Sequence, residues 1–424
     1  MKKALLSMLT VLLVLPLVAC TQPAAAGVVK SDKPRITSPD VSSADAVMLV
    51  EGNSAFAFDL HQALKDEEGN LFYSPYSISL ALAMTYAGAR GETEQQMADT
   101  LHFLLSKDRL HSAFNSLDIE LSKRGQGAQG KDGEGFRLNI VNAIWGQKDY
   151  SFLPAFLDVL AENYGAGLRL LDFVSAPEES RVTINDWVSD QTEGRIEDLI
   201  KKGIISSLTR LVLTNAIYFN AAWQYPFDED NTAEAAFHLL DGGDVTVQMM
   251  HQTEEFGYAE GDGYQTVELK YDGGDLSMVI LLPEEDNFEQ FEVSLDVQTL
   301  KKITDAVRIK NVILSMPKFE YESEFSLKGT LETLGMTEAF SMEADFSGMT
   351  GNDELFIKDV VHKTFVSVDE AGTEAAAATA VIMDLKAMPG EPVEVTIDRP
   401  FIFLIRDINT GAILFVGRVL DPGA

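Results

Sequence analysis

The sequence predicts an α+β fold built as one large domain, and three observations lead to this. Helical periodicity is concentrated in the first half of the chain, at residues 44–64, 78–87, 93–104, 154–164 and 184–191. Strand patterns dominate later, at residues 138–145, 210–219, 264–271, 276–282, 311–317, 360–368, 393–397, 401–406 and 413–419. Few strands alternate with helices, which argues against a doubly wound α/β fold. No second boundary and no repeat interrupts residues 44–424, so we expect a single domain there.

The first 43 residues read as an export signal followed by a tether. Lys2 and Lys3 precede an apolar run over residues 4–18, which is too short to favour a permanent spanning helix. Cys20 directly follows small Ala19, and this junction resembles the bacterial lipoprotein box. We therefore expect residues 1–19 to be a removed signal peptide and Cys20 to be lipidated; an ordinary signal peptide with an incidental Cys20 is the alternative. Residues 20–43 are rich in Pro, Ala, Ser, Thr and Asp, without apolar period, and predict a flexible tether.

Charge and cysteine content exclude several function classes. Removal of residues 1–19 takes away two lysines and no acid, so the formal charge of −33 becomes −35 in the mature chain. Such a surface repels phosphate backbones and argues against nucleic acid and against sulfated glycosaminoglycans as partners. Cys20 is the one cysteine, so no disulfide, thiol nucleophile or thiolate metal site is expected.

Motifs for catalysis or cofactor binding are not convincing. Residues 125–130 match GxGxxG, but they follow a polar helix end rather than a strand and run into more polar residues, so we interpret them as a loop. No GxSxG, HExxH or P-loop pattern occurs, and the six histidines lack ligand-like spacing. The abundant carboxylates suit a solvated acidic surface. We therefore expect no cofactor, no metal and no catalytic residues.

Residues 369–386 have two competing interpretations. Gly372, Thr373 and the four alanines Ala375, Ala376, Ala377 and Ala378 favour a surface helix by local propensity. At period two, however, Thr373, Ala375, Ala377 and Thr379 share one face with later apolar residues, while Glu374, Asp384 and Lys386 share the other. A strand of this kind could enter an existing sheet with its small side chains inward.

The surroundings of this segment decide between the two, because the chain resembles the serpin family from about residue 44 to residue 422. Residues 70–79 are similar to the block that leads into the family's central helix. Residues 184–188 and 192–196 resemble the helix that lies across the main sheet. Residues 213–219, followed by Trp223 and Phe227, resemble a strand beside the insertion gap, and residues 316–319, 334–336 and 398–403 complete the set in family order. The resemblance implies a central mixed β-sheet, two smaller sheets, surrounding helices and an exposed reactive-centre loop.

The resemblance also assigns roles to particular residues. It implies that Ser74, Ser77, Asn215 and His362 form a polar cluster, the shutter, beneath the gap in the main sheet, where buried polar groups need partners. It places Trp223 at the top of the gap, the breach. Taken alone, His362 reads as a satisfied core histidine and Trp223 as a core aromatic residue.

The hinge of the loop is the part that would insert. The resemblance assigns it to Glu370, Gly372, Thr373, Glu374, Ala375, Ala376, Ala377, Ala378 and Thr379. Ala371 departs from the family pattern, which more often has a charged residue there. Counting by family spacing from Gly372 places the reactive bond between Lys386 and Ala387, which suits a trypsin-like specificity pocket; Leu385 and Met388 remain alternatives for proteases with apolar pockets.

The function implied is inhibition of serine proteases as a suicide substrate, in which the cleaved loop inserts as a new β-strand. The partner would be a serine protease held as a covalent acyl complex, and the inhibitor a monomer anchored through lipidated Cys20 in a bacterial cell envelope. Two alternatives remain: a non-inhibitory serpin that binds or scaffolds in the envelope, and an adhesin that merely carries this fold.

Overall fold

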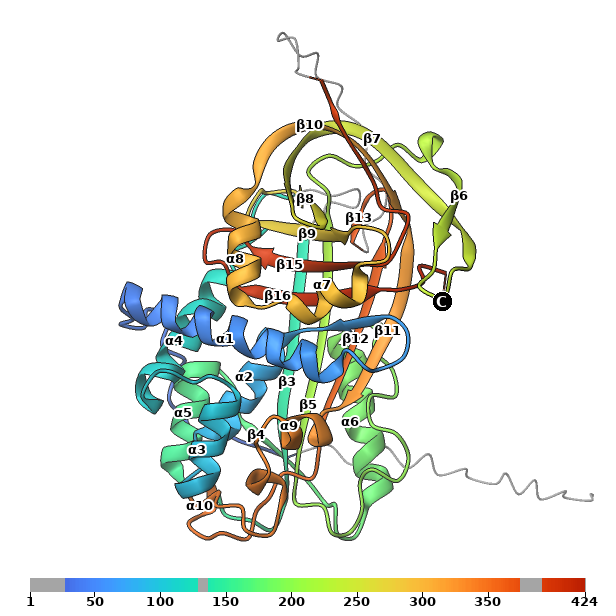
Figure 1. Cartoon of the computed structure of the whole chain (residues 1–424). Helices are drawn as coiled ribbons and strands as arrows, with labels where there is room; N and C mark the ends of the chain where they lie inside the picture. The colour runs from blue at the N-terminus through green and yellow to red at the C-terminus, as the bar shows by residue number, and fades with distance from the viewer. Residues whose placement is uncertain (1–26, 129–135, 374–390, 424) are drawn as a thin grey trace, which may run out of the picture.

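Two β-sheets surrounded by helices form the body of the protein (Figure 1). The computed structural model describes residues 27–128, 136–373 and 391–423. The helices are α1 (Ser43–Leu64), α2 (Pro75–Tyr86), α3 (Gly91–Thr100), α4 (Lys107–Leu121), α5 (Pro154–Tyr164), α6 (Pro177–Gln191), α7 (Phe288–Ser294), α8 (Val297–Ala306), α9 (Lys328–Thr333) and α10 (Ser347–Thr350). Most of the helical residues come before residue 192 and most of the strand residues after it, which confirms the predicted α+β class.

Within the described residues, the main sheet has seven strands. In spatial order they are β1 (Gly27–Val29), β4 (Leu168–Leu171), β3 (Phe136–Gln147), β5 (Leu211–Ala222), β13 (Gly372–Thr373), β12 (Val360–Val368) and β11 (Phe319–Ser326). The parallel pairs β3–β4 and β5–β12 sit among antiparallel ones, so the sheet is mixed, as predicted. In Figure 1, β3, β5 and β12 run side by side along the long axis of the molecule.

The second sheet has nine strands in the part of the chain that the structure describes. Its path is β14 (Val393–Thr396), β10 (Arg308–Pro317), β7 (Asp244–Gly261), β8 (Tyr264–Lys270), β9 (Leu276–Pro283), β15 (Phe401–Asp407), β16 (Ile413–Val419) and β2 (Leu71–Tyr73), with β6 (Ala233–His238) paired to β7. The expected two smaller sheets are joined here because β7 is 18 residues long. Its first part pairs with β6 and β10, and its last five residues pair with β8.

Helix α2 occupies the core. All twelve of its residues are buried, as expected for a helix that is apolar on every face and contacts β3, β5 and β16. Pro75 stands at its first position, and the Ser74 side chain caps it by accepting from the Ser77 amide. The start of α2 is therefore fixed by residues next to one another in the sequence. It places the polar side chains of Ser74 and Ser77 deep inside the protein.

The N-terminal segment differs from the prediction. Within the expected tether over residues 20–43, the described part from residue 27 lies on the body, and β1 adds a strand to the edge of the main sheet. Polar contacts of Lys33 and Arg35 with α4 and α5 continue this docking. Composition alone suggested a tether because the segment has few apolar residues, whereas its docking depends on backbone pairing and charge.

Among the described residues, no helix is both long enough and apolar enough to cross a bilayer.

Candidate functional site

Gly372 and Thr373, the last described residues before the segment expected to form the reactive loop, lie in the main sheet. Gly372 and Thr373 form β13 between β5 and β12; Thr373 pairs with Ala221 on one side and Val368 on the other. The Thr373 hydroxyl and the Tyr271 hydroxyl are 2.8 Å apart and buried. Thr373 is 1% exposed, so the first inward position of the predicted insertion strand is occupied by this small side chain.

Gly372 is required where it stands. Its φ is +157°, and a Cβ atom there would lie 2.2 Å from the carbonyl oxygen of Ala221. A residue with a side chain would push the hinge away from β5, because real Cβ atoms do not approach an oxygen that closely. The sequence interpretation of Gly372 as a hinge residue thus has a steric reason.

Below β13 the sheet is closed. β5 and β12 pair directly and in parallel over five positions, from Leu213 opposite Val360 to Ile217 opposite Thr364. A strand that continued downward from Thr373 would have to separate this pairing. The groups that hold β5 against β12 therefore control how easily the sheet can open.

The shutter residues do come together at this closed part. Asn215 of β5 and His362 of β12 are opposite each other in the register, and both are fully buried. His362 Nδ1 bonds to Asn215 Oδ1, while the Asn215 amide donates to Ser77 Oγ at 2.6 Å. On the other side of the ring, the Ser74 amide donates to His362 Nε2 at 3.1 Å. The cluster thus links both sides of the sheet opening to the start of α2.

These contacts fix the protonation of His362. Since Nε2 accepts a hydrogen bond, the proton is on Nδ1 and is donated to Asn215. Burial lowers the pKa of His362 to about 3, so the ring is neutral at pH 7. The interpretations as core histidine and as shutter residue are therefore one and the same here.

Asn142 also belongs to this cluster, although no sequence motif points to it. It lies on β3 opposite Asn215, and its side chain accepts from both Asn215 and Ser77 and donates to the Ser77 carbonyl at 3.2 Å. An asparagine within an otherwise ordinary strand pattern carries no motif. Its role depends on strand register, which the sequence alone does not provide.

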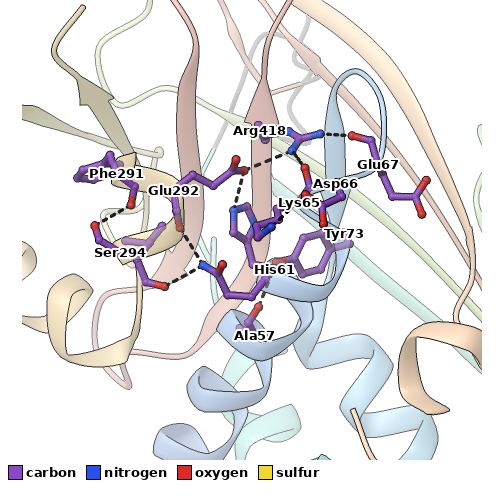
Figure 2. A network of polar contacts seen from close by, with 12 residues as sticks. Ala57, His61, Lys65, Asp66, Glu67, Tyr73, Phe291, Glu292, Ser294 and Arg418 are labelled. Carbon is purple, nitrogen blue, oxygen red and sulfur yellow. Dashed lines mark hydrogen bonds and ion pairs between the residues drawn. The ribbon is translucent and has the colours of Figure 1, made fainter. Parts of the chain in front are cut away.

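A second buried network fixes the segment that leads to Ser74 (Figure 2). Arg418, which is 2% exposed, donates to the carbonyl oxygens of Lys65, Glu67 and Gly69 in the turn between α1 and β2. Its charge is matched by buried Glu292 of α7, at 3.4 Å, and the same carboxylate lies 3.1 Å from His61. Because β2 ends directly before Ser74, this network holds the entry to α2 in place.

Trp223, which the resemblance assigns to the breach, lies directly after β5 and contacts the segment that leads into β13. Its indole Nε1 donates to the Asp369 carbonyl at 3.0 Å, and its backbone amide donates to the Ala371 carbonyl at 2.9 Å. The ring stacks on Tyr271, with centroids 4.7 Å apart. Trp223 is thus both a core aromatic residue and a direct contact of the hinge.

Glu370 anchors the hinge from the other side. Its carboxylate accepts from Lys318 Nζ and from Thr232 Oγ1, each at 2.7 Å. Burial by itself raises the pKa of Glu370, but these two hydrogen bonds outweigh it, and the pKa is lowered. Lys318 belongs to a block already singled out in the sequence, but its pairing with Glu370 could be seen only in three dimensions.

The buried environment of residue 371 explains why this chain has alanine where the family pattern more often has a charged residue. Ala371 is 2% exposed and packs against Ala222. A charged side chain at this position would lose solvent contact, which is costly without a partner. Alanine suits the site because the hinge is seated in the sheet.

Several predicted site residues lie outside the described residues. These are the hinge residues Glu374, Ala375, Ala376, Ala377, Ala378 and Thr379, the reactive bond Lys386–Ala387, and Cys20. Over the described ranges, no group of three or more His, Cys, Asp or Glu side chains is arranged to hold a metal ion.

Comparison with known proteins agrees with this geometry. The model of the family described as serpin (serine protease inhibitor) matches residues 51–422. The chain belongs to the serpin family. Leukocyte elastase inhibitor A of Rattus norvegicus is 42% identical to this serpin over 88% of the chain and 99% of that protein.

Solved structures show the same fold. The native state of tengpin, a thermophilic serpin, has a TM-score of 0.82 at 30% identity and covers 94% of this serpin and 100% of tengpin. Human thyroxine-binding globulin complexed with thyroxine has a TM-score of 0.79 at 29% identity, covering 89% and 99% of the two chains. The resemblance inferred from separate sequence blocks is thereby confirmed over almost the whole domain.

Proposed function

We propose that this serpin inhibits serine proteases by trapping the acyl-enzyme, and that trypsin-like proteases are its targets. The observation that carries the proposal is the hinge seated between β5 and β12, with small, buried Thr373 as its first inward residue. A strand that has already begun to enter the sheet needs only small inward residues to continue, and the alternating Thr and Ala pattern supplies them.

The chemistry begins at the Lys386 carbonyl carbon. The protease serine oxygen attacks it, the bond to the Ala387 nitrogen breaks, the proton passes to that amine, and an ester joins Lys386 to the protease. The freed segment then adds to the main sheet as a new strand, whose main-chain hydrogen bonds stabilise the inserted state. The fourteen residue-to-residue steps from Gly372 to Lys386 span roughly 46 Å as a strand, so the attached protease is carried along the sheet.

Trapping depends on a competition between insertion and deacylation. A dozen or so new ladder hydrogen bonds, at about 0.5–1.5 kcal/mol net each, provide on the order of 10 kcal/mol for insertion. Pressing the protease against the far end of the sheet would distort its oxyanion hole and stop deacylation. Slow insertion, in contrast, would release a cleaved inhibitor and an active protease.

The direct test is incubation of residues 21–424 with trypsin, followed by denaturing gels and intact-mass analysis. We expect a stable covalent complex and release of a peptide that begins at Ala387. Elastase- and chymotrypsin-type enzymes belong in the same panel, because Leu385 and Met388 are neighbouring candidates and a relative carries the name of an elastase inhibitor. Cleavage by every enzyme without any complex would contradict the proposal.

Two variants test the mechanism against a matched control. Thr373→Arg places a long charged side chain at the inward position and should convert the inhibitor into a substrate. Glu374→Arg places the same side chain at the neighbouring outward position and should leave inhibition intact. Equal behaviour of the two variants would contradict insertion with this register.

Lys386→Ala should abolish trypsin inhibition if the reactive bond is assigned correctly.

The second candidate function is binding or scaffolding without inhibition. It is favoured by one finding, namely that the same fold in thyroxine-binding globulin is described in complex with thyroxine. Loop cleavage distinguishes the two: an inserting inhibitor should gain thermal stability on cleavage, while a pure binder or an adhesin should not.

We further propose that this serpin is exported, lipidated at Cys20 and anchored in a bacterial cell envelope as a monomer. The lipobox-like junction at Ala19–Cys20 supports this proposal. Intact mass of the protein expressed with its signal would test it, because cleavage before Cys20 and added acyl chains change the mass in a defined way.

A further inference from the structure

The body of this serpin is shaped to receive its own N-terminal segment. β1 pairs with β4 over three positions, with Gly27 opposite Leu170 and Val29 opposite Leu168. Gly167 makes room for this strand, because a Cβ there would lie 2.8 Å from Lys30 Cβ and 3.0 Å from the Val29 carbonyl oxygen. The docking site is thus part of the fold.

Charge complementarity continues the docking beyond β1. Lys33 Nζ lies 3.1 Å from both Asp158 and Glu162 on α5. Arg35 reaches Asp118 of α4 at 2.6 Å and donates to Asn115 at 2.8 Å. Hydrogen bonds to Glu162 and Asp158 raise the pKa of Lys33. A basic segment thereby lies on acidic helices of a strongly acidic protein.

Strand register shows at which end of the molecule the segment enters. Gly27 is opposite Leu170, Leu170 is opposite Gly146, and Gly146 is opposite Leu211, the first residue of β5. The hinge residue Gly372 is opposite Ala222, the last residue of β5. Eleven residues of strand separate the two levels, a distance of roughly 36 Å. The N-terminal segment therefore joins the sheet at the end opposite the hinge, which we call the base end.

The length of the connection to Cys20 then limits the orientation. Seven residues lead from Cys20 to Gly27, and even fully extended they cover at most about 25 Å. This is shorter than the roughly 36 Å between the base end and the hinge. A free tether from Cys20 to Ser43 would reach about 80 Å and would allow every orientation.

We propose that docking of residues 27–36 holds the base end of the main sheet next to the lipid bilayer and keeps the reactive-loop end away from it. The proposal rests on lipidation of Cys20. The inverted orientation, with the hinge end on the bilayer, would lift Gly27 farther from the membrane than the seven residues can reach. The reactive loop is thereby presented to soluble proteases.

The test measures energy transfer to the membrane from each end. The full chain, lipidated during export, is reconstituted into phosphatidylcholine vesicles that carry an acceptor dye on their headgroups. Single donors are attached at Leu208→Cys, beside the start of β5, or at Glu394→Cys on β14, which follows the reactive loop; both positions are exposed. Lipidation consumes the thiol of Cys20, the one native cysteine, so the engineered thiol is the one labelled.

We expect several-fold more efficient transfer from position 208 than from position 394. Lys33→Glu combined with Arg35→Glu should release the segment and largely remove this difference. Lys30→Glu makes the same kind of charge change at an exposed position of the segment and should preserve it.

The outcomes separate the two proposals. Failure of the protein to float with vesicles would contradict the lipid anchor itself. Equal or inverted transfer efficiencies in protein that does float would overturn the orientation alone, as would an unchanged difference in the Lys33 and Arg35 double variant whose far-UV circular dichroism remains native.

Discussion

Acidification should weaken this serpin through His362, and the size of the effect follows from the structure. The imidazole bonds to Asn215 and Ser74 and stacks against Phe325, so its direct neighbours are uncharged. Burial lowers its pKa from 6.5 to about 3 in the folded protein. Between these two values the unfolded chain binds the proton and the folded chain does not, so stability rises with pH across that window. The stability that His362 contributes is fully present above pH 6.5 and is lost as the pH falls toward 3.

The loss of stability at a given pH depends on how far that pH lies below 6.5, the pKa of histidine in the unfolded chain. At pH 5 the gap of about 1.5 units below 6.5 corresponds to about 2 kcal/mol of lost stability. His111 is a second buried histidine whose pKa is lowered to about 3, by burial first and by Lys107 second, and it contributes a similar loss. A total near 4 kcal/mol is a large part of the stability of a typical protein.

The assay is urea unfolding at pH 7 and pH 5, followed by tryptophan fluorescence. His362→Gln keeps a donor and an acceptor but does not titrate, so it should remove about 2 kcal/mol of the pH-dependent loss. His111→Gln should remove about the same amount, and the double variant should remove the sum, since the two sites share no partner. An equal loss from pH 7 to pH 5 in the wild type and in His362→Gln would refute the reasoning.

Three further predictions concern the hinge. Lys318→Met leaves the Glu370 carboxylate nearly buried with one hydrogen-bond donor fewer, and should lower the free energy of unfolding by about 1–3 kcal/mol, measured by denaturant titration. Tyr271→Phe removes the hydroxyl that contacts Thr373 and should cost about 1 kcal/mol, seen as a lower thermal midpoint. Gly372→Ala should displace the hinge from β5 and change the fluorescence of the neighbouring tryptophan; an unchanged spectrum would contradict the close contact.

Much of the fold was accessible from the sequence because long periodic segments dominate it. The strands Val360–Val368 and Ile413–Val419 and the helix Pro154–Tyr164 have the bounds that their patterns predict. Elements with mixed patterns were missed, including the exposed strand β6 and the short helix α7. In β7 the burial pattern loses its alternation where the strand passes from one set of partners to another, so no period could reveal it.

The site residues could be named in advance only where the sequence resembles the serpin family. Gly372 and Thr373 were assigned because the segment around them resembles the hinge of that family, where small residues follow one another. Asn142 and the partner of Glu370 could not, since both depend on which strands become neighbours. The docking of residues 27–36 was hidden for the same reason: its stability comes from strand pairing and ion pairs with residues more than 80 positions away.

The two ends of the main sheet connect the inhibitory mechanism to the membrane. If insertion carries the trapped protease by roughly 46 Å from the hinge, the enzyme arrives at the base end, where the N-terminal segment leaves the body. A protease of about 220 residues has a radius of gyration near 17 Å and a diameter of about 44 Å, more than the roughly 25 Å that the seven-residue connection allows. An anchored complex could therefore form only if the body tilts or if residues 27–36 detach from α4 and α5. That segment is held by strand pairing of β1 with β4 over only three positions and by partly exposed ion pairs, whose individual contribution is small. Detachment is therefore the less costly of the two movements for a reaction driven by about 10 kcal/mol of strand insertion.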